Sequence, residues 1–142
     1  MLKRLAMMCV LTMVAVPAMA QEVVVQGGPP PALRKNLDAF KTAVNGTAEQ
    51  YETMAKTVFD AALFKAQTPA ERKADFDRMR AFFGKLEFNN IQRNGGPDAP
   101  LQVFVKGSAN EGVIWIGIDD ATSKFISVKP EIPVKKHEDP RH

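Results

Sequence analysis

The chain is poor in the residues that thiol and imidazole chemistry require. Its 142 residues include one cysteine and two histidines. Cys9 lies among the first twenty residues, while His137 and His142 lie in the last ten. If the first twenty residues are removed on export, the remaining 122 contain no cysteine. Disulfides, thiol catalysis and thiolate metal sites are then excluded from that part of the chain.

Long apolar runs are absent, apart from one near the start. Lys3 and Arg4 precede the apolar stretch Leu5–Val16, and the small-x-small sequence Ala18–Ala20 follows it. This order is typical of an export signal. Because the stretch is shorter than the ~20 residues of a membrane-spanning helix, cleavage near Ala20 is favoured over retention as an anchor. We expect a periplasmic or secreted protein that has no membrane association after cleavage.

Neither sign of charge dominates the rest of the chain. Without Lys3 and Arg4 it has 17 basic residues against 16 acidic ones. A protein that binds nucleic acid or anionic lipid gathers basic side chains on one face or in one run, and no such run is present. Nucleic acid and membrane are therefore not expected as partners.

Two segments flank what we expect to be a single domain, residues 32–132. Residues 21–31, QEVVVQGGPPP, form a linker rich in glycine and proline. Within it, Val23–Val25 either adds a strand to a sheet edge or stays disordered. Residues 133–142 form a charged tail that we expect to be disordered.

Three helices are predicted in the first half of the domain. The first covers Ala32–Asn45, where apolar residues recur every three or four positions. The second, Thr47–Leu63, opens with a Thr-x-x-Gln capping box and has the strongest helical periodicity in the chain. The third, Thr68–Phe83, opens with a Thr-x-x-Glu capping box and stops at Gly84, which suits a left-handed conformation.

Four strands follow, separated by runs of turn-forming residues. They are predicted at Leu86–Arg93, Leu101–Lys106, Val113–Ile118 and Lys124–Lys129. Strands joined by short turns pair with their neighbours, so we expect an antiparallel meander. The predicted fold class is α+β, with three N-terminal helices packed on a four-stranded antiparallel sheet.

Alternation along the strands predicts what each face of the sheet carries. Pairing Gly107 with Gly112 across the turn sets Phe104 opposite Trp115 on the outer face, with Phe125 nearby. The inner face then presents an aliphatic surface to the helices, formed by Leu101, Val103, Val105, Ile114, Ile116, Ile118, Ile126 and Val128. A strand that is apolar on both sides is unusual in an open antiparallel sheet, so something should cover the outer face.

Several local sequences between Ala32 and Ile132 are also familiar. They are Phe40…Val44-Asn45-Gly46, Thr68-Pro69-Ala70-Glu71-Arg72, Phe83-Gly84-Lys85-Leu86-Glu87, the Trp115 strand and the Phe125-Ile126 strand that ends at Pro130. Together they resemble the small accessory α+β domain of the nuclear-transport-factor-2-like (cystatin-like) superfamily, in the version found beside secreted β-lactamase-type serine hydrolases. The resemblance implies a curved sheet that forms a cone-like roll with a pocket. It also implies dimerisation through the outer sheet face, as in many relatives.

Groups able to perform acid–base chemistry are few. The resemblance implies an Asp–His or acidic pair in the cone of enzyme members, but both histidines lie in the 133–142 tail. Pro140 breaks the helix that metal chelation by that tail would need, so a solvated tail is favoured and no metal or cofactor is expected. The acidic residues of the helices fall between apolar positions, so we expect them to face water; they are Asp38, Glu52, Asp60, Asp75 and Asp77.

The candidate binding residues fall into two groups. Tyr51, Met54 and Ile116 are candidates for lining a pocket, although the helical stripe favours core packing for Tyr51 and Met54. Phe104, Trp115 and Phe125 are candidates for an interface, because an exposed aromatic patch usually marks one. The alternative is that Val23–Val25 or the curvature of the sheet covers them.

Two hypotheses of function remain at this point. In the first, the chain is an exported non-catalytic binding module that acts as a homodimer, as an accessory to another exported protein, or as a binder of a small apolar ligand. In the second, it is a small isomerase- or hydrolase-like enzyme that uses a pocket carboxylate with a raised pKa.

Overall fold

The computed structural model describes residues 29–96 and 98–132. The predicted export signal, Val23–Val25 and the 133–142 tail lie outside the described residues. The described elements belong to one compact unit that begins at Pro31. In chain order they are α2 (Pro31–Val44), α3 (Ala48–Val58), α4 (Ala61–Ala66), α5 (Pro69–Phe83), β1 (Leu86–Gln92), β2 (Leu101–Gly107), β3 (Glu111–Ile118) and β4 (Phe125–Pro130).

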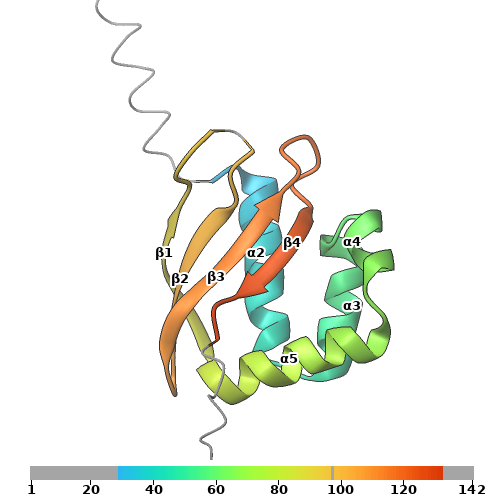
Figure 1. The fold of residues 1–142 in the computed structure, drawn as a ribbon, viewed down its shortest axis with the longest axis vertical. Helices are drawn as coiled ribbons and strands as arrows, with labels where there is room; N and C mark the ends of the chain where they lie inside the picture. Colours follow the sequence, from blue (N-terminus) through green and yellow to red (C-terminus); the bar gives the residue numbers. More distant parts are fainter. Residues whose placement is uncertain (1–28, 97, 133–142) are drawn as a thin grey trace, which may run out of the picture. The chain divides into compact units, whose positions relative to one another are not determined.

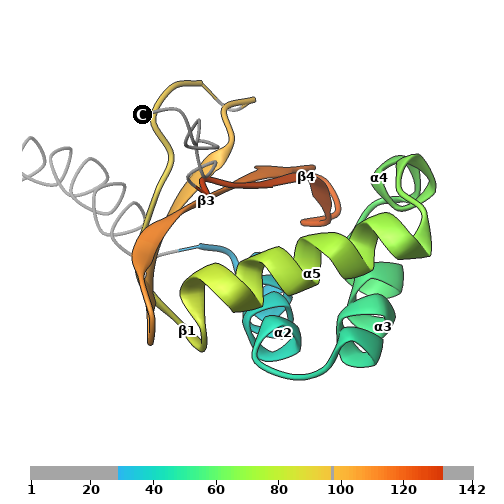
Figure 2. The ribbon, with the colours of Figure 1, turned by 60° about the horizontal axis from the view of Figure 1, so that its bottom comes forward.

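The predicted α+β class is confirmed, with four helices and a four-stranded antiparallel sheet in the described part of the chain. The strand order is β1-β2-β3-β4, as a meander requires. Figures 1 and 2 show α2, α3 and α5 gathered on one side of the sheet, with α2 beside α3 and α5 crossing both, and α4 next to β4. None of the described helices is long and apolar enough to cross a membrane.

The predicted helix starts at Thr47 and Thr68 are confirmed, whereas the predicted stop at Gly84 is confirmed in part. Both predicted capping boxes form, at Thr47 with Gln50 and at Thr68 with Glu71. Pro31, predicted to end the linker, is instead the first residue of α2, a position that suits proline. Gly84 ends α5 with φ +72° and ψ −132°, so its φ is positive as predicted, but its ψ lies outside the left-handed helical region.

The second predicted helix is wrong in one respect, because the chain leaves the helix at Phe59 and Asp60. Phe59 is extended, with φ −75° and ψ 144°, and forms a parallel bridge with Phe125 of β4. The Asp60 N–H donates to the Phe125 carbonyl at 2.9 Å, and the Asp60 carboxylate accepts from the Leu63 N–H at 2.7 Å. Asp60 is therefore the N-cap of the separate helix α4, and it does not simply face water as predicted.

The predicted pairing of β2 with β3 is shifted by two residues. Val105 lies opposite Gly112 and Phe104 opposite Val113. The turn is two residues shorter than predicted, because the Gly107 N–H donates to the Asn110 carbonyl at 3.1 Å. A two-residue shift leaves every side chain on its predicted face, since the side-chain period of a strand is two. Trp115 consequently lies between Gln102 of β2 and Lys129 of β4.

A β-bulge in β4 reverses two predicted orientations. Gly117 pairs with Ser127 and Ile118 pairs with Phe125, so Ile126 is the extra residue on β4. Phe125 therefore points into the core and is fully buried, and its predicted place on the outer face is wrong. Ile126 was predicted on the inner face, but its side chain is 47% exposed. No other large hydrophobic residue that the structure describes is as exposed.

The core lies between the helices and the inner face of the sheet. Its fully buried side chains come from both layers, including Phe40 of α2, Met79 of α5, Ile116 of β3 and Phe125 of β4. The rings of Phe40 and Phe125 meet edge to face, with centroids 5.8 Å apart. The inner face of the sheet is therefore covered by a closely packed apolar layer.

Candidate functional site on the outer face of the sheet

Two of the three pocket candidates belong to the core. Ile116 is fully buried, and Tyr51 is 2% exposed. The Tyr51 ring contacts Phe76 and Phe59, with centroids 5.7 and 6.2 Å away. Burial raises the pKa of the Tyr51 hydroxyl, and the nearby Asp75 carboxylate raises it further. Neither side chain lines a described pocket, so core packing is the role that the structure gives them.

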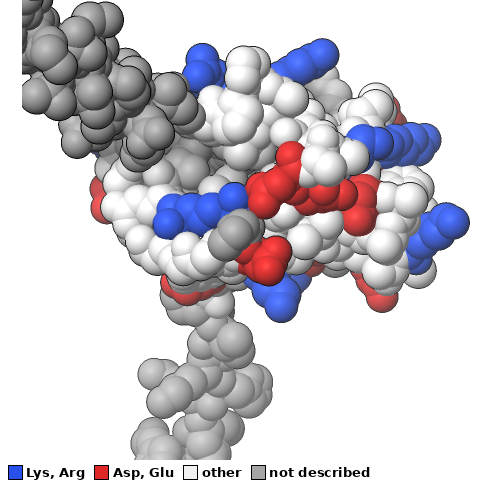
Figure 3. Space-filling model, turned by 90° about the horizontal axis from the view of Figure 1, so that it is seen from above, with Lys and Arg blue, Asp and Glu red and all other residues white. Residues whose placement is uncertain are grey.

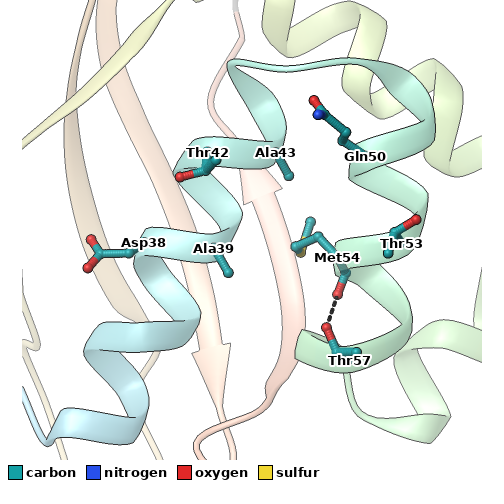
Figure 4. Close-up of a pocket in the computed structure, with 8 residues that line it drawn as sticks. All are labelled: Asp38, Ala39, Thr42, Ala43, Gln50, Thr53, Met54 and Thr57. Carbon is teal, nitrogen blue, oxygen red and sulfur yellow. Dashed lines mark hydrogen bonds between the residues drawn. The ribbon is translucent and has the colours of Figure 1, made fainter.

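Met54 is the pocket candidate that does line a hollow. A groove of about 410 Å³ lies between α2 and α3. Figure 4 shows Met54 pointing across it toward Ala39 and Ala43, whereas Asp38 points away from the space between the helices. The small alanine side chains leave room that a larger residue would fill, and the rest of the lining is Asp38, Thr42, Gln50, Thr53 and Thr57.

A buried ion pair joins α3 to α5, contrary to the prediction that Glu52 only faces water. Arg72 is 3% exposed. It donates from Nε and Nη2 to both Glu52 carboxylate oxygens at 2.6 and 2.7 Å. Its Nη1 donates to the carbonyls of Phe64 and Gln67, at 2.8 and 2.6 Å, and the guanidinium lies 4.0 Å from the Phe64 ring centroid. Arg72 thus ties the last carbonyls of α4 to the rest of the fold.

Sequence reasoning missed this pair, although a signal was present. Arg72 stands four residues before Phe76, at the next position of the apolar stripe of α5. The Arg72 hydrogen bonds lower the pKa of the Glu52 carboxyl, so the carboxylate form is favoured. A general acid working near neutral pH needs the opposite shift. The pair is therefore a structural connection between helices.

Phe104 and Trp115 lie on the outer face of the sheet, as predicted, but they are diagonal neighbours. Phe104 lies opposite Val113, and Trp115 is two residues further along β3. All three side chains are half-buried. The helices in Figure 2 lie on the other side of the sheet. Together with Ile126, which the bulge turns outward, these residues form the outer-face cluster: Phe104, Val113, Trp115 and Ile126.

Charges of both signs surround the outer-face cluster. Lys106 has an acidic neighbour on each side, Glu87 in β1 and Glu111 in β3. On the β4 side, the Trp115 indole N–H donates to the Glu131 carboxylate at 2.6 Å, and Lys129 lies opposite Trp115. Opposite charges in adjacent strands stabilise each other, so the rim does not repel a surface of similar composition.

A hollow of about 280 Å³ lies beside Phe104 on this side of the sheet. Its lining comes from β1, β2 and β3, and includes Asn89, Phe104, Lys106, Glu111 and Val113. Asn89 lies at the register shift in β1, between Phe88 and Asn90. The bulge there changes the course of the edge strand next to the hollow.

Figure 3 shows basic and acidic side chains interspersed on the face that it presents. The described residues of that face form no large patch of one sign of charge. Among the residues that the structure describes, no group of three His, Cys, Asp or Glu side chains is placed to hold a metal ion.

Comparison of the chain with protein-family models, with curated proteins and with solved structures finds no match.

Proposed function

We propose that this chain is an exported, non-catalytic interaction module that pairs with a second copy of itself through the outer-face cluster. The observation that carries the proposal is the position of Phe104 and Trp115 on a sheet face that none of the described helices covers. Apolar residues grouped on an open face usually mark an interface. Aromatic side chains supply much of the binding energy at such surfaces.

A second copy suits this face for two reasons. In a two-fold symmetric pair the same patch meets itself, so the patch must be self-complementary in charge. Lys106 and Lys129 lie among Glu87, Glu111 and Glu131, so lysines of one copy are able to meet carboxylates of the other. Within one copy Glu87 already lies 3.9 Å from the Lys41 ammonium and Glu131 accepts from Trp115, which leaves Glu111 as the acidic residue best placed for such a contact. The hollow beside Phe104 also offers space for the exposed part of a large side chain from the partner.

The size of the face predicts weak association. Four strands, each about 4.8 Å wide and about seven residues long at 3.4 Å per residue, give a flat area of roughly 450 Å². A stable interface buries about 800 Å² per partner. Side chains that project from the sheet add to this area but do not bring it to 800 Å². We therefore expect a dimer with a dissociation constant in the micromolar range.

The resemblance to the nuclear-transport-factor-2-like superfamily remains a proposal. It is supported by the chain order, with helices first and a meander second, and by the position of the helices on one face of the sheet. The curved, cone-like roll that the resemblance implies belongs to the same proposal, as does export after cleavage near Ala20. The enzyme hypothesis gains no support from Glu52, because its pKa is shifted downward.

The test is sedimentation velocity of the exported chain over micromolar concentrations, comparing wild type with Trp115→Ala and Phe104→Ala. We expect wild type to show a concentration-dependent dimer and both variants to stay monomeric. Phe88→Ala is the matched control, since Phe88 is also a half-buried aromatic residue but packs against the core. Thermal unfolding at a concentration where wild type is monomeric separates association from folding. A monomeric wild type, or equal dimer mass in all variants, would refute the proposal.

A further inference from the structure

A second hollow lies next to the groove between α2 and α3. It has a volume of about 480 Å³ and lies where the first half of α2 and the end of α3 meet the turn between β3 and β4. Ala39 and Thr57 line both spaces, so the groove and this second hollow adjoin. Cavities of this size lie in the range that small-molecule sites occupy.

The second hollow carries two basic residues in its lining. Lys35 of α2 and Lys124 of the β3–β4 turn both line it. Neither ammonium group has an ion-pair partner among the residues that the structure describes. The first turn of α2, which contributes Ala32 to the lining, contains no acidic residue that would neutralise the positive end of the helix.

The walls of the second hollow are held in place by hydrogen bonds. Asn36 donates from Nδ2 to the Ser123 carbonyl at 2.8 Å, which joins α2 to the β3–β4 turn. On the α3 side, the Met54 carbonyl accepts from the Thr57 hydroxyl at 3.0 Å, and the Ala55 carbonyl accepts from the Phe59 N–H at 3.1 Å. Because both carbonyls accept a hydrogen bond, the negative electrostatic potential at the C-terminal end of α3 is reduced on the side of the hollow.

We propose that the groove and the adjoining hollow together bind one free carboxylate with a medium-length alkyl chain. The carboxylate would lie between Lys35 and Lys124, and the chain would extend over Ala39 and Ala43 against Met54. Charge complementarity supports the head group, because two exposed lysines that have no ion-pair partner among the described residues line the same hollow. The adaptable thioether and the small alanines suit an alkyl chain. This site is separate from the outer-face cluster and does not depend on dimerisation.

The test is a titration of the ¹⁵N-labelled exported chain followed by amide chemical shifts. Octanoate has both the carboxylate and an alkyl chain. Acetate has the carboxylate without the chain, and hexanol has an alkyl chain with an uncharged hydroxyl in place of the carboxylate. We expect saturable shifts with octanoate at the amides of Asn36, Ala39, Thr57 and Thr122, and much weaker binding of the other two. Shifts that do not saturate, or that centre on the outer-face cluster, would overturn the proposal.

Two variants test the ends of the site separately. Lys35→Gln combined with Lys124→Gln should weaken octanoate binding about tenfold, to the level of hexanol, because two charge contacts are lost. The matched control is Lys65→Gln with Lys85→Gln, which changes the net charge equally at exposed lysines outside the hollow. Equal weakening by both pairs would show a non-specific charge effect and refute the site.

The tail end is tested by Ala39→Leu, which fills the groove where the two spaces meet. We expect loss of the octanoate shifts while the spectrum stays folded. Ala70→Leu, at an exposed position of α5, is the control and should bind octanoate like wild type. Unchanged binding by Ala39→Leu would exclude the groove as the position of the alkyl chain.

Discussion

Replacing Arg72 by alanine removes the partner of Glu52 and the donors to two carbonyls at the end of α4. Breaking a buried ion pair by removing one member costs about 3–5 kcal/mol, because the other charge is left without compensation. Glu52 is 28% exposed and therefore keeps part of its hydration. We accordingly expect the lower end of that range, about 3 kcal/mol, for Arg72→Ala.

The measurement is urea denaturation of the exported chain followed by circular dichroism, with thermal unfolding as a second reading. In a domain of this size, 3 kcal/mol corresponds to a fall in Tm of about 10–15 °C. Arg72→Lys should recover little of the loss, because an ammonium group cannot bond both carboxylate oxygens and both carbonyls as the guanidinium does. If Arg72→Ala does not fold, Glu52→Gln provides the milder test and should cost about 1–2 kcal/mol.

The control is Arg78→Ala on the same helix. Arg78 pairs with Asp75, but its side chain is 63% exposed, so its loss should change stability by less than about 1 kcal/mol. The reasoning would be refuted if Arg72→Ala and Arg78→Ala had equal effects. In that case, burial of the ion pair would contribute nothing beyond an ordinary surface contact.

Three further predictions concern single positions. The pKa of Glu52 is lower in the folded state than in the unfolded state. Its carboxylate therefore stabilises the fold fully above the unfolded-state pKa, and this stabilisation is lost as the pH falls through the folded-state pKa. The stability difference between wild type and Glu52→Gln should accordingly shrink in urea titrations below about pH 4. Gly84→Ala should cost about 1–3 kcal/mol in thermal unfolding, because φ is +72° and a Cβ would lie 2.2 Å from the Ser108 hydroxyl, whereas Gly96→Ala, with no atom within 4 Å of the added Cβ, should be nearly neutral. Asp60→Ala should cost about 1 kcal/mol by removing the N-cap of α4; equal urea midpoints for this variant and wild type would contradict the capping role.

Features set by neighbouring residues were predictable from the sequence. The capping boxes at Thr47 and Thr68 involve side chains three residues apart, and the helix that follows brings them together. The alternation in β2 and β3 placed Phe104 and Trp115 on the outer face even though the predicted register was wrong. Because a strand repeats every two residues, a two-residue shift of register changes the partners but not the faces.

Other features depended on contacts between distant parts of the chain. The helical periodicity continues through Phe59, but the backbone there bonds to β4, which lies more than sixty residues later. The bulge at Ile126 inverted the predicted positions of Phe125 and Ile126, and no glycine marks it in that strand. Pairing across a sheet decides such bulges, and the pairing is a property of the whole sheet.

The candidate sites divide in the same way. The sequence by itself determined the α+β class, the starts of α3 and α5, and the outer-face positions of Phe104 and Trp115, because these follow from patterns over a few residues. Only the tertiary structure decided that Tyr51 and Ile116 are core, that Arg72 is buried against Glu52, and that Lys35 and Lys124 line one cavity. The physical reason is that burial and charge pairing depend on which distant side chains come together, and periodicity carries no information about distance in space.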